Sequence, residues 1–206
     1  ETMLADVKLM KELNINAIRS PGRPLSIDML DLCDEYGIYV IDDMSLCSTP
    51  YSERDEQSIP GNQSIWQNVA VERLIGVLDR DRNHPSVIVW SLGTDSGNGD
   101  VIKALRNYLL SVDSRLLIYD DYVDFSDMAV SLKWDITSIR NYLDDSSNKK
   151  PLIFQSDDLG YLNGAGNLAT WVELCMNYGR AQGGFLANWI DYAIYTPIEG
   201  TMRDAK

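Results

Sequence analysis

The chain has 206 residues, of which 45% are hydrophobic, and its formal net charge is −13. This length suits one globular domain with a sizeable core, and the negative charge repels nucleic acid and anionic lipid surfaces alike. No run approaches the roughly 18 apolar residues of a membrane span. We therefore expect no nucleic-acid partner and no membrane span.

The first 43 residues repeat a helix followed by a strand. Apolar residues at helical spacing predict a helix over 3–13, and the short apolar run 15–19 is typical of a buried strand. The unit recurs as a helix over 27–36 and a strand over 38–43, whose apolar run ends in two carboxylates.

The same alternation continues through the middle of the chain. A long loop over 44–63, rich in Pro, Gly, Ser and Asp, precedes a helix predicted over 65–78. A strand over 87–92, a helix over 101–110 and a strand over 116–119 follow. Long loops in compact domains usually carry function, so the 44–63 loop points to a site nearby.

The last third of the sequence predicts three further strands. We expect a short strand over 136–139, a helix over 140–143 and a strand over 152–155. A helix over 168–178 then leads to a final strand over 184–190.

Strands that read as continuous apolar runs and alternate with helices indicate an α/β fold with a parallel sheet. Seven strands are one short of a (β/α)8 TIM barrel, and 206 residues fall below the roughly 250 typical of one. We predict such a barrel lacking its first strand in this chain, with that strand upstream of Glu1. A doubly wound sheet is the alternative, but the glycine-rich fingerprint expected after its first strand is absent.

In a barrel, the carboxyl ends of all strands meet at one face, where chemistry takes place. The residues expected at this face are Arg19, Asp42, Asp43, Thr94, Asp95, Gln155 and Trp189. The only histidine, His84, precedes a strand and is expected at the opposite end in a structural role. The acidic pair at 120–121 is interpreted as part of a solvated face.

A long motif gives a family resemblance. Residues 80–93, RDRNHPSVIVWSLG, closely resemble the segment before the acid/base carboxylate of glycoside hydrolase family 2, which includes β-galactosidases, β-glucuronidases and β-mannosidases. Further segments resemble other barrel strands of that family, namely 9–19, 32–42, 150–153 and 182–185.

The resemblance has consequences for domain organisation. In that family, β-sandwich domains and the first barrel strand come before the region that this chain resembles. We therefore expect residues 1–206 to be a single barrel domain of a longer multidomain protein, with those sandwich domains and a carbohydrate as its partners. The resemblance favours a periplasmic or extracellular bacterial location.

The positions that carry the family's chemistry differ in this chain. Retaining members are expected to use one glutamate as acid/base and another as nucleophile. Asp95 stands where the acid/base glutamate is expected, after Thr94 in place of an asparagine, and Gln155 stands at the nucleophile position. The neutral amide of Gln155 cannot form the usual glycosyl ester.

Other positions at this face also differ. The segment 21–24 lacks the family's histidine, and 47–50 lacks the glutamate and histidine that hold magnesium in some members. Because a hard divalent cation needs oxygen ligands such as carboxylates, we expect no metal there and no cofactor. Asn188 replaces an acidic residue just before Trp189.

Three functions remain open from the sequence. The first is a catalytically degenerate barrel retained as a structural or glycan-binding domain. The second is an active β-glycosidase that uses Asp95 with Asp157 or Asp158 in an inverting reaction, or an acetamido sugar as internal nucleophile. The third is an interaction module whose old active face is filled by side chains.

Five residues are candidates for substrate binding, and for some of them a purely structural role is an alternative. They are Arg19, Asp43, Thr94, Asn188 and Trp189. Arg19 either contacts a sugar or pairs with Asp42 or Asp43, and Trp189 either stacks on a sugar or belongs to the core.

Overall fold

The computed structural model describes residues 1–47, 60–120, 123–131, 134–156, 168–186, 189, 194–198 and 201–205. The helices are α1 (Thr2–Glu12), α2 (Ile27–Tyr36), α3 (Gln67–Asp81), α4 (Asp100–Val112), α5 (Ile136–Asp144) and α6 (Leu168–Asn177). Short 3-10 turns are η1 (Ser64–Trp66) and η2 (Val123–Phe125). The strands are β1 (Ala17–Arg19), β2 (Tyr39–Asp43), β3 (Val87–Ser91), β4 (Leu116–Ile118), β5 (Ala129–Val130), β6 (Leu152–Ser156), β7 (Ala181–Leu186), β8 (Ile194–Ile198) and β9 (Thr201–Ala205).

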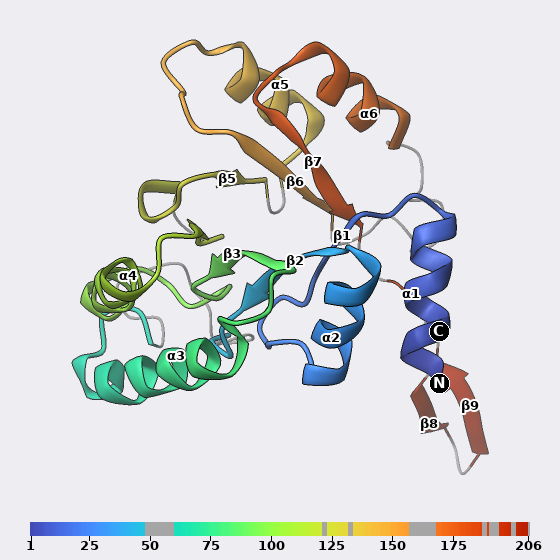
Figure 1. Ribbon diagram of the computed structural model, residues 1–206. Helices are drawn as coiled ribbons and strands as arrows, with labels where there is room; N and C mark the ends of the chain where they lie inside the picture. Colours follow the sequence, from blue (N-terminus) through green and yellow to red (C-terminus); the bar gives the residue numbers. More distant parts are fainter. Residues whose placement is uncertain are drawn as a thin grey trace.

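Seven of these strands are parallel and form two sheets. The first sheet has the order β1-β2-β3-β4 and the second β5-β6-β7, while β8 and β9 form a separate antiparallel hairpin. The two parallel sheets are neighbours in the middle of the molecule, and the helices lie on the outside (Figure 1). Strand β1 also lies against β7, which brings the two sheets together at that edge.

The side chains between the sheets form one apolar cluster that both sheets share. Buried residues of β2, β3, β4, β5 and β6 meet there with Met128, and Phe185 of β7 packs against them; the strand residues are Ile41, Val89, Ile118, Val130 and Ile153. Their chain neighbours, such as Val40, Leu117 and Phe154, belong instead to clusters under the helices. This alternation is that of strands around a barrel interior. The described strands therefore form the predicted α/β arrangement of a partial TIM barrel, as two parallel sheets that are not joined into one closed cylinder.

Local sequence signals explain how α2 begins and ends. Ser26 caps its first turn by accepting a hydrogen bond from the Met29 amide, and Gly37 ends it with a φ of 67°. Glycine adopts this left-handed conformation without the Cβ clash that other residues meet. Asn14, just after α1, likewise has a φ of 60°.

The predicted helices and strands agree with the structure except in the region before β6 and at β7. The strand expected over 136–139 is wrong, because these residues begin α5, where Asp135 caps the first turn by accepting from the Ser138 amide. The strand of this unit is β5, two residues long and too short to give a sequence pattern. The last parallel strand, predicted over 184–190, is described from Ala181 to Leu186, and residues 187, 188 and 190 of the prediction lie outside the described residues.

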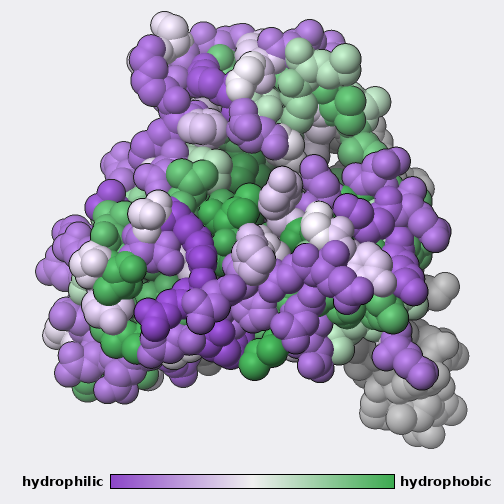
Figure 2. Space-filling view, viewed as in Figure 1, coloured by the Kyte–Doolittle hydropathy of each residue, from purple (hydrophilic) through white to green (hydrophobic). Residues whose placement is uncertain are grey.

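The surface reflects the same layering. Hydrophobic residues gather over the centre of the molecule in the view of Figure 1, while hydrophilic residues cover most of the outer surface over α2 and α3 (Figure 2). Within the described residues, no helix has the length and apolar character needed to span a membrane.

Candidate active face

Arg19 joins the carboxyl ends of five parallel strands. Its Nη1 donates a hydrogen bond to Gln155 Oε1 at 2.6 Å. Its Nη2 donates to Asp43 Oδ2 at 2.9 Å, to Asp120 Oδ2 at 2.9 Å and to Ser91 Oγ at 3.1 Å. The Arg19 side chain is only 2% exposed, and those of Asp43 and Asp120 are fully buried. Arg19, Asp43 and Gln155 therefore meet in one buried network, as the barrel arrangement predicts.

Asp43 accepts two further hydrogen bonds in this network. Its Oδ2 also accepts from the Ser91 hydroxyl at 2.5 Å, and its Oδ1 accepts from the Gly22 amide at 3.1 Å. Burial raises the pKa of Asp43 to about 6, although the Arg19 cation and the Ser91 hydrogen bond oppose the rise. Burial by itself would lower the pKa of Arg19, but the charges of Asp120 and Asp43 raise it. The guanidinium is therefore a fixed positive charge in this site.

Thr94 and Asp95 lie at the same face, just after β3. The Thr94 amide donates to Leu46 O at 3.1 Å, and Thr94 forms a parallel bridge with Cys47, so the segments after β2 and β3 stay paired. Gly93 makes this close approach possible, since a Cβ there would lie 2.5 Å from Leu46 O at a φ of 116°. Asp95 itself has a φ of 48°.

The backbone of Asp95 holds some strain. A residue other than glycine in the left-handed region costs on the order of 1 kcal/mol, and aspartate tolerates it better than most. Such strain gathers at functional sites because the surroundings must impose it. The Asp95 side chain is thus held in a defined, partly buried place after β3.

Asp42 does not belong to this face, and its expected place there is wrong. Successive strand residues point to opposite sides of a sheet, so Asp42 points away from Asp43 and lies beside Asp81 and Arg80 of α3. Arg80 binds Asp81 through Nε at 2.5 Å and Nη2 at 2.6 Å. Burial, together with the neighbouring Asp81 carboxylate, raises the pKa of Asp42 to about 8.

Trp189 lies against α1. Its indole Nε1 donates to Asp6 Oδ1 at 3.1 Å, and the residue is 37% exposed. The other candidates of this region, Asp157, Asp158 and Asn188, lie outside the described residues. In the segment compared with the magnesium ligands, Cys47 is exposed and 48–50 are likewise outside the described residues.

Sequence reasoning missed two members of the network, Ser91 and Asp120. The assignment of Asp120 to a solvated face is wrong, because this residue is buried and pairs with Arg19. A signal was present, since Asp120 follows the β4 run just as Asp43 ends the β2 run. Parallel strands bring such ends to one edge.

Comparisons with known proteins agree with the barrel fold. The family model described as "Glycosyl hydrolases family 2, TIM barrel domain" matches residues 1–204. A β-galactosidase of Halalkalibacterium halodurans is 36% identical over 94% of the chain, and β-galactosidase BgaC of Bifidobacterium adolescentis is 35% identical over 98%. Among solved structures, a β-glucuronidase of Bacteroides uniformis has a TM-score of 0.68 at 16% identity, over 93% of this chain and 28% of its own.

The match concerns one part of longer relatives. The chain spans about a fifth of the length of the two β-galactosidases, 20% and 21%, so these relatives contain further sequence beyond the barrel. Because the family pattern extends over nearly all 206 residues, the chain belongs to glycoside hydrolase family 2, as its TIM barrel domain.

Proposed function

We propose that this barrel no longer hydrolyses glycosides by the two-glutamate route and is retained as a glycan-binding or structural domain of a larger protein. The observation that carries the proposal is the contact between Arg19 and Gln155. A neutral amide occupies the position that resembles the family nucleophile, and its oxygen lies 2.6 Å from the guanidinium.

The chemistry of this amide opposes nucleophilic attack. A carboxylate that attacks an anomeric carbon becomes a neutral ester, whereas an attacking amide oxygen becomes a cationic imidate. The oxygen that would attack also accepts a hydrogen bond from Arg19, which draws electron density away from it. Gln155 is therefore a poor nucleophile by its chemical nature.

The remaining features favour sugar binding over an empty scaffold. Asp95 keeps a carboxyl group at the acid/base position, in a strained and partly buried place. Trp189 leaves a third of its surface exposed, and its ring offers a face for a sugar. Similarity to two β-galactosidases makes β-galactosides the sugars to test first.

The test is hydrolysis of aryl β-galactosides and aryl β-glucuronides by the full-length protein. We expect no turnover above the uncatalysed rate. Turnover that Asp95→Ala abolishes and the control Asp79→Ala preserves would refute the proposal, since the Asp79 side chain is 63% exposed on α3. That outcome would support the alternative in which Asp95 works with Asp157 or Asp158.

A binding measurement separates the two retained roles. Galactose titrated into the protein and followed by calorimetry should give binding that Trp189→Ala weakens if the domain holds glycans. No binding at millimolar galactose would assign the structural role. Ordered galactose in a crystal would rule out the module whose face is filled by side chains.

A further inference from the structure

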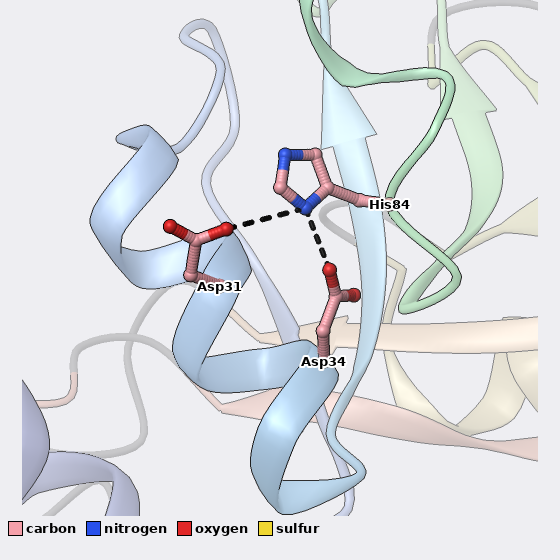
Figure 3. A group of neighbouring side chains, drawn as sticks. All are labelled: Asp31, Asp34 and His84. Atoms are coloured by element: carbon pink, nitrogen blue, oxygen red, sulfur yellow. Dashed lines mark hydrogen bonds and ion pairs between the residues drawn. The ribbon is translucent and has the colours of Figure 1, made fainter.

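A second polar cluster lies at the end of the first sheet opposite Arg19. Asp31 and Asp34 project from α2 toward His84, which lies in the loop before β3 (Figure 3). His84 Nδ1 is 2.7 Å from Asp34 Oδ2 and 3.9 Å from Asp31 Oδ1. The three ligand atoms all lie within 4.8 Å of one another.

Local structure fixes two of the three groups before any ligand arrives. The other oxygen of Asp34 accepts a hydrogen bond from the Ser86 amide at 2.9 Å, which leaves Oδ2 facing the imidazole. The His84 amide donates to Asp81 O at 3.0 Å, and its side chain is 14% exposed. Asp31, three residues before Asp34 and therefore on the same helix face, is 66% exposed and free to adjust.

We propose that Asp31, Asp34 and His84 bind a divalent transition-metal ion, with zinc as the best fit. One imidazole nitrogen and two carboxylate oxygens are ligands that zinc accepts, whereas magnesium prefers oxygen alone. Zinc sits about 2.0 to 2.2 Å from such atoms, so tetrahedral ligands lie roughly 3.3 Å apart. The observed 2.7 and 3.9 Å bracket that spacing. Water completes the coordination, and the Nδ1 proton, where present, leaves to solvent.

A hydrogen bond between His84 and Asp34 accounts for two of the residues only. It gives no role to Asp31, whose carboxylate is exposed yet turned toward the same nitrogen. A metal ion uses all three groups. It would join α2 to the loop that leads into β3, and because the unfolded chain does not hold these groups together, binding would stabilise the fold. This site is independent of the function proposed for the opposite face.

The chain offers a direct spectroscopic test, because His84 is its only histidine. In the full chain labelled with 15N-histidine, zinc chloride should shift the Nδ1 resonance to its metal-bound position, and magnesium chloride should leave it unchanged. Zinc bound at the exposed thiol of Cys47 would not change this signal.

Matched variants complete the test. Asp31→Asn should weaken zinc binding by roughly tenfold or more in calorimetry, and it should abolish the rise in melting temperature that zinc gives the unaltered chain. Asp28→Asn, exposed on the same helix one turn earlier, should behave like the unaltered chain. An unchanged Nδ1 resonance, or equal zinc affinity in both variants, would overturn the proposal.

Discussion

The buried pair Asp42 and Asp81 predicts how stability depends on pH. Both carboxyls are fully buried, and of these two it is Asp81 that Arg80 binds, through both carboxylate oxygens. Asp42 therefore holds a proton that an unfolded chain would release near pH 4. Its pKa is raised to about 8, so the folded state binds the proton more tightly than the unfolded state. Its contribution to stability is complete below pH 4 and is lost as pH rises toward 8.

The magnitude follows from the width of that window. One pKa unit corresponds to about 1.4 kcal/mol, and the buried Asp43, with a pKa raised to about 6, gives a further loss of the same sign between pH 4 and 6. Of these two carboxyls, Asp42 is the one whose folded-state pKa lies well above pH 6. We expect the free energy of unfolding to fall between pH 6 and 8 by on the order of 2 to 3 kcal/mol.

Asp42→Asn isolates this effect, since its amide is neutral at every pH and can still donate to Asp81. Urea denaturation at pH 6 and pH 8 gives the two free energies. The fall between them should shrink to under about 1 kcal/mol in Asp42→Asn and stay unchanged in Asp79→Asn, a control at an exposed position of α3. Equal falls in the unaltered chain and in Asp42→Asn would refute the reasoning.

Three further predictions concern the active face. Arg19→Met leaves Asp43 and Asp120 buried without their cation, so the free energy of unfolding measured in urea should fall by about 3 to 5 kcal/mol. The control Arg82→Met, whose side chain is 58% exposed, should lower it by under about 1 kcal/mol. Gly93→Ala places a methyl group 2.5 Å from Leu46 O and should lower the free energy of unfolding by on the order of 2 kcal/mol or more. In the control Gly76→Ala, in α3, the new methyl group meets no atom within 4 Å, so the melting temperature should rise. Gln155→Glu restores a carboxylate beside Arg19, so aryl β-galactoside hydrolysis by the full-length protein should rise by roughly three orders of magnitude or more. No gain in a folded Gln155→Glu protein would show that Asp95 or another position also blocks the reaction.

The sequence predicted the elements whose signal lies within one segment. Strand β2 reads as an apolar run that ends in Asp42 and Asp43, and α2 carries its own cap at Ser26 and its stop at Gly37. Strand β5 was not predicted, because two residues are too few to show an alternation of apolar and polar side chains. Its partner strand β6 also lies more than 20 residues away along the chain. The boundary of α5 was missed since Asp135, its cap, was not recognised as a helix start.

The sequence predicted which residues lie at the carboxyl ends of the strands, but it did not predict which of them form hydrogen bonds and ion pairs with one another. Parallel topology places Arg19 and Gln155 at one end, although 136 residues separate them along the chain. The partners of each charge depend on which side a side chain faces. Asp42 and Asp43 are identical in type and adjacent in sequence, yet one meets a second carboxylate and the other meets a guanidinium.

The charges around Arg19 make the stability of the protein depend on whether residue 155 is an amide or a carboxylate. One guanidinium already faces two buried carboxylates, so the cluster of Arg19, Asp43 and Asp120 has a formal charge of −1 when both acids are ionised. A glutamate at 155 would make it −2 in a site that solvent barely reaches, and repulsion between buried like charges is costly. Gln155 keeps the hydrogen bond to Arg19 without adding charge. An amide in place of a carboxylate at position 155 therefore removes a nucleophile and also avoids repulsion among the buried charges around Arg19. Gln155→Glu should lower the free energy of unfolding at pH 7 even if it restores hydrolysis. A stability gain in that variant would mean that Arg19 lacks sufficient anionic partners, contrary to the network described for it.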